Sequence, residues 1–275
     1  MSTAFIGMAA HLIGLCGMPV SIPVYEPMIC AQNHYCHGTS NSDQALTAAL
    51  QAELEAGRRR NVSILLKTHL SSTSSGYSRA LHSFNAPAAA AYRANRLDQL
   101  LCKVKDCMTQ SSGAWLVDPV TRHRVNCSIN RRSIEQPMQP LVHFPPQTFS
   151  YLRSTVLSGV HASTAFAGKL QGLGWRDAKA VATEDLLLFE HDPSEAGLSH
   201  SVRAWSVLLT ALQVPGVSTC TPRIRSYLQQ PSLRQRAPPP RHDTMIDNAA
   251  EVWQALRGLP PEVVAKYWRG LPKQG

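Results

Sequence analysis

One short polar segment places the tightest constraint on how this chain folds. Residues 34–40 read His-Tyr-Cys-His-Gly-Thr-Ser and follow the apolar stretch 27–30. Residues 42–55 carry apolar side chains at a spacing of three to four, which predicts an amphipathic helix capped by Ser42 or Asp43. A strand that ends in a turn before such a helix brings its polar side chains to a strand end, where ligands bind.

A second segment joins a carboxylate to a run of large apolar residues. Residues 182–192 read Ala-Thr-Glu-Asp-Leu-Leu-Leu-Phe-Glu-His-Asp, and Asp192-Pro193 closes the run. Its length and composition predict a buried strand that Glu184 opens. An ordinary core strand with an acidic edge has the same pattern, so this segment alone does not assign a function.

Between these two segments the sequence predicts a strand followed by a helix. The strand covers residues 77–85 and carries Tyr77 and Ser83. The helix covers residues 86–101 and carries Tyr92, and its Pro87 is tolerated because it falls in the first turn.

In this order the three segments resemble ADP-ribosyltransferases of the diphtheria-toxin and poly(ADP-ribose) polymerase type. The Tyr-x-His-Gly-Thr string is similar to the first active-site strand of that family, and Glu184 matches its catalytic glutamate. The resemblance implies an α+β fold, a split antiparallel β-sandwich with flanking helices. It also implies that NAD is a substrate and that no metal ion takes part.

The resemblance further implies roles for the residues of the first segment and for the catalytic position. His37 would hydrogen-bond the ribose of NAD, and Gly38 and Thr39 would approach the nicotinamide amide, since glycine permits close approach of the backbone. Glu184 would bond the ribose 2′-hydroxyl and stabilise the positive charge that develops as nicotinamide leaves.

The middle segment supplies the remaining contacts that the resemblance implies. Ser83 would bond the nicotinamide amide, and a tyrosine would stack on the nicotinamide ring. The family also places a tyrosine on the strand itself, and aligning Tyr92 with the helical tyrosine puts Leu81 at that position. Tyr77 and Tyr92 are therefore both candidates for the stacking residue.

The distribution of charge bears on partners and delivery. The chain carries a formal net charge of +9, yet the first charged residue is Glu26. An uncharged leader, residues 1–25, is similar to the type III secretion signals of bacterial effectors, and a buried or disordered N-terminus is the alternative. The leader lacks the basic start of a secretory signal peptide, and its apolar stretch is too short and too often interrupted to span a membrane. The basic residues are scattered, so we expect a solvated basic surface and no specific nucleic-acid site.

These features together predict three regions: the leader, a catalytic domain over residues 26–195, and a helical extension over residues 196–275. The whole resembles effectors that ADP-ribosylate host ubiquitin on threonine, which implies a monomer acting on a host protein in the host cytoplasm. The extension is predicted to contain helices at 198–214, 243–257 and 261–268, with a Pro- and Arg-rich linker over 220–241. The apolar residues of the last two helices, Trp253, Leu256, Val263, Val264 and Trp268, are expected to form a docking core or a partner surface.

A second interpretation concerns residues 102–155, which resemble a U-box ubiquitin ligase that holds a ubiquitin-conjugating enzyme without metal. Its discriminating residues are Asp118, Ile129 and Ile134, and residues 114–129 are expected to form a β-hairpin. The seven cysteines are odd in number and irregularly spaced, which argues against a disulfide framework or a structural zinc site and favours a reducing compartment.

Overall fold

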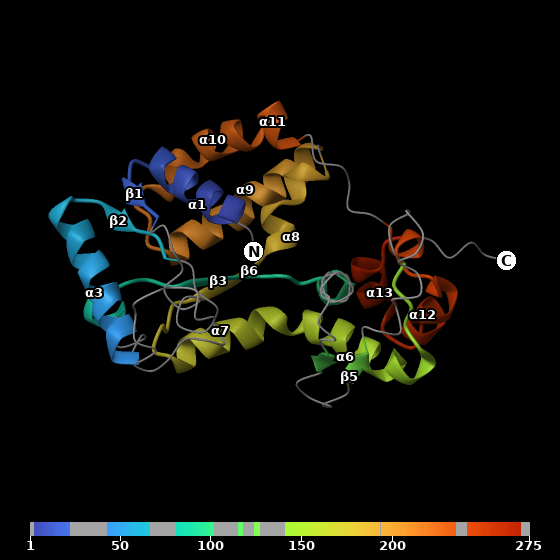
Figure 1. The fold of residues 1–275 in the computed structure, drawn as a ribbon. Coiled ribbons are helices and arrows are strands. Elements are labelled where there is room, and N and C mark those ends of the chain that lie inside the picture. The colour runs from blue at the N-terminus through green and yellow to red at the C-terminus, as the bar shows by residue number, and fades with distance from the viewer. Residues whose placement is uncertain are drawn as a thin grey trace. The chain divides into compact units, whose positions relative to one another are not determined.

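The computed structural model describes residues 3–22, 43–66, 81–101, 115–117, 124–126, 141–192, 194–234 and 241–270 (Figure 1). Helices predominate and the strands are short, so the expected mixture of helix and strand is confirmed. The described strands form three separate pairs, of which two are parallel. An antiparallel β-sandwich is not seen in these ranges.

The chain divides into two compact units, and each is described by itself. Unit 1 comprises residues 1–92 and 164–236, and unit 2 comprises residues 93–163 and 237–275. The elements of unit 1 are α1 (Thr3–Leu15), β1 (Val20–Ser21), α3 (Asp43–Arg59), β2 (Ser63–Ile64), β3 (Ala89–Tyr92), most of α7 (Ala162–Gly172), β6 (Lys179–Ala182), α8 (Thr183–Leu186), η4 (Leu188–Glu190), α9 (Glu195–Ala211), α10 (Val217–Leu228) and α11 (Pro231–Arg234). Those of unit 2 are β4 (Trp115–Val117), β5 (Arg124–Asn126), η3 (Pro146–Thr148), α6 (Phe149–Val160), η5 (His242–Thr244), α12 (Ala249–Leu256) and α13 (Pro261–Tyr267).

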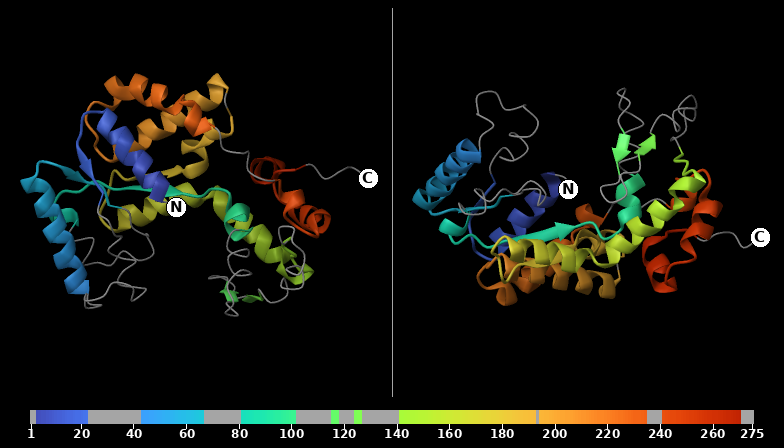
Figure 2. Two further views of the ribbon diagram at one scale, coloured as in Figure 1. Left: turned by 45° about the horizontal axis from the view of Figure 1, so that its top comes forward. Right: turned by 90° about the horizontal axis from the view of Figure 1, so that it is seen from below.

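The parallel pair β3–β6 is the central layer of unit 1. Successive side chains of a strand point to opposite faces. Ala89 and Ala91 therefore pack against the core built on α1, α9 and α10, whereas Ala90 packs against Leu170 and Trp175. Figures 1 and 2 show these three helices on one side of the strand pair and α7 on the other.

The structure corrects the helix expected over residues 86–101. Residues 89–92 form β3, and a helical segment begins only at Arg96. Alanine favours a helix by intrinsic propensity, but its small side chain also fits a strand buried between two layers of helices, and this pairing prevails. Asn95 caps the helix that follows, because its Oδ1 accepts the backbone N–H of Asp98 at 3.1 Å.

Two neighbouring strand predictions have different outcomes. Within the predicted strand 77–85, residues 81–83 form a helical turn, so that prediction is wrong for the described part. The hairpin expected over 114–129 is confirmed, since β4 and β5 pair antiparallel with Leu116 opposite Val125. Asp118, Ile129 and Ile134, which would discriminate the U-box interpretation, lie outside the described residues.

The uncharged leader contributes a core helix. Met8, Ala9, Leu12 and Ile13 of α1 are buried against the core that α9 and α10 share. A disulfide joins Cys16, just after α1, to Cys220 of α10, with the Cα atoms 5.1 Å apart. The irregular cysteine spacing argued against disulfides, but spacing along the chain carries no information on two residues separated by 204 positions that meet only in the folded core.

The C-terminal predictions are confirmed in part. The helices expected at 198–214 and 261–268 correspond to α9 and α13. The linker expected over 220–241 is wrong for α10 and α11: Cys220, Ile224 and Leu228 recur every four residues and bury one helical face, despite Pro222 within the helix. The helix expected from residue 243 begins only at Ala249, after the turn η5.

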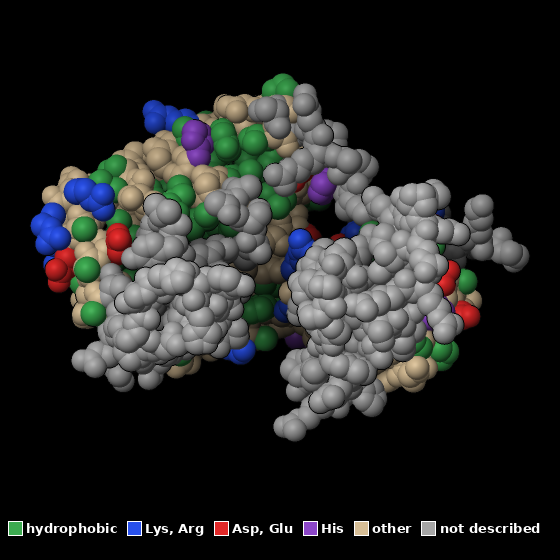
Figure 3. Space-filling view, in the orientation of Figure 1, with side chains coloured by type: hydrophobic (Ala, Val, Ile, Leu, Met, Phe, Trp, Pro, Cys, Tyr) green, Lys and Arg blue, Asp and Glu red, His purple; other side chains and the backbone are tan. Residues whose placement is uncertain are grey.

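Basic side chains gather at one end of α3. This helix confirms the prediction for residues 42–55 and extends it to Arg59. Arg58 and Arg59 lie in its last turn, and Figure 3 shows basic side chains over this end. Cations are favourable there because the carboxyl end of a helix carries partial negative charge.

In unit 2 a partly buried ionic cluster ties the C-terminal segment to the helix that begins at Arg96. Asp98 accepts hydrogen bonds from Nη1 and Nη2 of Arg269 at 2.6 and 2.5 Å. The fully buried His242 donates from Nε2 to Asp98 at 2.8 Å, because its Nδ1 already accepts the backbone N–H of Arg269 at 2.7 Å. Burial alone would raise the pKa of Asp98, but the hydrogen bonds from His242 and Arg269 and the charge of Arg269 hold that pKa below its ordinary value.

This cluster predicts a pH-dependent stability. A lowered folded-state pKa stabilises the protein above the ordinary Asp value of 3.8, and that contribution is lost as the pH falls below it. Asp98→Asn should lower the free energy of unfolding by about 1.5–3 kcal/mol at neutral pH. Denaturant unfolding at several pH values should show that the free energies of unfolding of wild type and Asp98→Asn converge below pH 3.8. A difference in free energy that is independent of pH would contradict the assignment.

Two helical glycines offer a matched test of packing. A Cβ at Gly159 of α6 would overlap the backbone carbonyl oxygen of Ala94, whereas one at Gly168 of α7 meets open space. Gly159→Ala should therefore destabilise the protein by about 1–3 kcal/mol, while Gly168→Ala should be neutral or stabilise it by up to about 1 kcal/mol. Equal effects of the two substitutions on the thermal unfolding midpoint would contradict the packing of α6 in unit 2.

Candidate functional site

The candidate site lies where β3 and β6 end. The two strands run parallel, so Tyr92 and Ala182 are paired at their carboxyl ends, and Thr183 and Glu184 follow directly. The hydroxyl of Thr183 is 3.2 Å from the carbonyl oxygen of Tyr92 and 3.2 Å from Oε2 of Glu184. The Thr183 hydroxyl has one hydrogen, which it can donate either to the Tyr92 carbonyl oxygen or to the Glu184 carboxylate.

The segment around Glu184 is a helical turn, which corrects the strand expected over residues 182–192. Leu186 and Phe189 are fully buried, whereas Leu187 and Leu188 are only partly buried. A strand would bury every second residue, while burial three residues apart is typical of helical geometry. Glu184 lies in the first turn of α8, where the partial positive charge of a helix start favours a carboxylate.

Helix α9 holds this turn in place through two buried side chains. Ser201 donates its hydroxyl to the carbonyl oxygen of Asp185 at 3.0 Å and accepts the backbone N–H of Phe189 at 3.0 Å. Trp205 donates its indole N–H to the carbonyl oxygen of Leu186 at 2.9 Å. Both side chains are fully buried, so these hydrogen bonds fix the backbone after β6 against the hydrophobic core.

The ring of Tyr92 is held on the opposite face of the strand pair. It shares the side of Ala90, and its ring stacks on Phe166 of α7 with centroids 5.4 Å apart and planes 23° apart. Stacked aromatic rings at this separation are favourable. The pair places an aromatic surface close to the strand end that leads into Glu184.

An ionisable pair flanks the site. Oδ1 of Asp185 lies 3.1 Å from Nε2 of His200 on α9, and both side chains are partly exposed. Glu184 and Asp185 are thus neighbours in the first turn of α8, and the imidazole of His200 contacts Asp185.

The other residues predicted for the site are separated from this strand end or fall outside the described ranges. His37, Gly38, Thr39 and Tyr77 belong to segments that the structure does not describe. Ser83 is exposed and lies beyond the amino ends of the strands, because its neighbour His82 stacks on Trp175 at 4.6 Å, before β6 begins.

Ser83 is therefore not brought together with Tyr92 and Glu184. The structure instead adds Thr183 and Phe166. Thr183 adjoins Glu184 in sequence, but its contact with Tyr92 exists only once the strands pair. Phe166 lies in the segment 165–170, a short run near glycines whose pattern predicts neither a helix nor a strand.

Comparisons with known proteins assign neither a family nor a fold. No protein-family model matches the chain, and neither the curated proteins nor the solved structures searched contain a significant match. In the part of the chain that the structure describes, no three His, Cys, Asp or Glu side chains converge as metal ligands would. Within the same part, every helix is too short or too polar to cross a membrane.

The support of α8 by α9 predicts unequal effects of two serine substitutions in one helix. Ser201→Ala leaves the N–H of Phe189 without its acceptor and should lower the free energy of unfolding by about 1–3 kcal/mol. Ser206 donates only to the carbonyl oxygen of Val202 in its own helix, so Ser206→Ala should change stability little. Denaturant unfolding of both variants provides the test, and a neutral Ser201→Ala would contradict the anchoring.

Proposed function

We propose that unit 1 is a mono-ADP-ribosyltransferase that binds NAD at the carboxyl ends of β3 and β6. One observation carries the proposal: the Thr183 hydroxyl lies beside both the backbone carbonyl of Tyr92 and the carboxylate of Glu184, so two residues that the resemblance selects lie at the same strand end. In parallel sheets, ligands bind in the crevice outside the carboxyl ends of the strands, where the loops leave space and the helices begin. The resemblance of residues 35–39 to the NAD-binding strand of these transferases supports the same reaction class.

In the proposed reaction the bond between C1′ of the ribose and the nicotinamide nitrogen breaks. Nicotinamide leaves with the bonding electrons, and an acceptor oxygen or nitrogen forms the new bond at C1′ and loses its proton to solvent. Positive charge develops on the ribose in between. A carboxylate at a fixed position stabilises that charge without reorganising, an effect of about 2.7–4 kcal/mol for one group.

Each side chain at the strand end has a role in this scheme. Glu184 accepts a hydrogen bond from the ribose 2′-hydroxyl and faces the developing charge. Tyr92, whose ring stacks on Phe166, offers its aromatic surface to nicotinamide. The resemblance supplies His37, Gly38 and Thr39 as the remaining NAD contacts and Tyr77 as the alternative stacking residue, whereas Ser83 lies apart from this strand end and has no role in the scheme.

The acceptor in this proposal is a side chain of a host protein, with a threonine of ubiquitin as the first to test. Delivery would follow the type III route through the leader 1–25. Because Leu12 and Ile13 are buried in the folded protein, the leader could act as a signal only while the chain is unfolded. Secretion would thus precede folding of unit 1.

The direct test incubates the protein with labelled NAD and a eukaryotic cell lysate. Wild-type protein should transfer label to a protein band, and Glu184→Gln should reduce transfer by about a hundredfold to a thousandfold because the carboxylate charge is lost. The label should appear on ubiquitin in a parallel reaction with the purified acceptor.

The matched control is Glu55→Gln, which removes an exposed carboxylate from α3 of the same unit. It should transfer label at the wild-type rate. Absence of label with folded wild-type protein, or full activity of Glu184→Gln, would exclude the assignment.

A further inference from the structure

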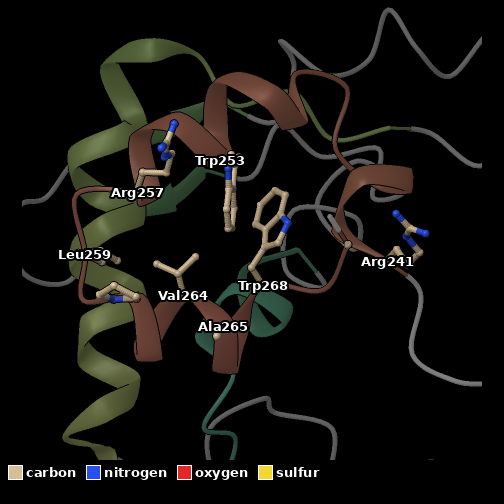
Figure 4. A pocket seen from close by; sticks show the side chains of 9 residues that line it. Arg241, Trp253, Arg257, Leu259, Val264, Ala265 and Trp268 are labelled. Atoms are coloured by element: carbon tan, nitrogen blue, oxygen red, sulfur yellow. The ribbon is translucent and has the colours of Figure 1, made fainter. Parts of the chain in front are cut away.

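A cavity in unit 2 has no part in the proposed transfer reaction. It lies against α12 and α13 and has a volume of about 780 Å³ (Figure 4). Small-molecule sites in proteins commonly occupy about 300–1,000 Å³. All of its lining residues belong to unit 2, so the cavity exists within one compact body.

The wall of the cavity is aromatic and aliphatic. Trp253 of α12 and Trp268, just after α13, have ring centroids 5.5 Å apart and planes tilted by 49°. Figure 4 shows the two indoles close to one another, with Val264 and Ala265 of α13 beside them. Val264 and Trp268 also belong to the buried core, which makes this wall rigid. A flat aromatic ligand could stack on the faces or edges of these two indole rings.

One cation at the cavity lacks an ionic partner in the described structure. Arg241 is already paired with Asp243, from Nε at 3.0 Å and from Nη2 at 2.5 Å. Arg257, which follows α12, donates to the neutral amide oxygen of Gln254 at 3.3 Å, and no carboxylate of the described residues forms an ion pair with it. A guanidinium that is free to form a bidentate contact favours a carboxylate.

A buried donor lies at the other side of the aromatic wall. The indole N–H of Trp268 is buried and has no acceptor within hydrogen-bond distance among the described residues. In Figure 4 its nitrogen lies on the ring edge toward Arg241. Buried N–H groups are paired in most proteins, so an oxygen atom entering between this edge and the exposed Arg241 side chain would complete the bonding.

We propose that unit 2 binds a small aromatic carboxylate in this cavity. The ring system lies against Trp253 and Trp268, and the carboxylate pairs with Arg257. An oxygen substituent at the far end of the ring system accepts the indole N–H of Trp268. The site therefore selects an anion with an apolar, planar body over a neutral molecule of the same shape.

Isothermal titration calorimetry of the full chain with 6-hydroxy-2-naphthoate tests the proposal, with the primary amide of the same acid as a neutral isostere. The carboxylate should bind more tightly than the amide by up to about fivefold, the ratio expected for one exposed ion pair. Arg257→Gln should abolish this preference. Arg203→Gln, an exposed position on α9 outside the cavity, should preserve it.

A second pair of variants tests the location without removing a charge. Ala265→Trp fills the cavity and should weaken binding of the carboxylate by about tenfold or more. Ala250→Trp adds the same side chain at an exposed position of α12 that does not line the cavity and should leave binding unchanged. Equal affinity for acid and amide, absence of measurable binding, or binding unaffected by Ala265→Trp in a folded protein would each overturn the proposal.

Discussion

The parallel pairing of β3 with β6 is the interaction on which the rest of unit 1 depends. It joins Tyr92 to Thr183 across 91 positions of sequence and separates two layers of helices. Small alanine side chains allow α9 to approach one face and α7 the other. Because both strands end at the same edge, the start of α8 and the backbone of Tyr92 are brought to one place, and that place is the candidate site.

Elements with a strong helical period could be predicted from the sequence. The apolar spacing in α3, α9 and α13 specifies one buried face, and these helices are present near the predicted bounds. The alanine-rich stretch 86–92 could not be assigned in this way, because its local preference is for helix and only the distant partner β6 makes it a strand. The leucine run after Glu184 was equally ambiguous, since four consecutive apolar residues suit both a strand and a short helical turn.

The candidate site was predictable only in part for a related reason. Tyr92 and Glu184 stood out by residue type and context, whereas Thr183 and Phe166 gain their meaning from contacts made in the folded state. Ser83 was placed by alignment to a strand, and the helical turn at residues 81–83 together with β3 moves it away from the strand end. In unit 2 the sequence left open whether Trp253, Val264 and Trp268 form a core or a binding surface. Val264 and Trp268 are buried in the core, and all three residues line the cavity.

Hydrogen–deuterium exchange of the intact protein with and without NAD tests the central claim most directly. The account predicts that NAD slows exchange in the peptide that covers α8 and η4, because a ligand at the strand ends shields the backbone between Thr183 and Glu190. Peptides from α12 and α13 in unit 2 serve as the internal reference and should be unchanged. Protection confined to other parts of the chain, with none at α8, would contradict a nucleotide site at the ends of β3 and β6.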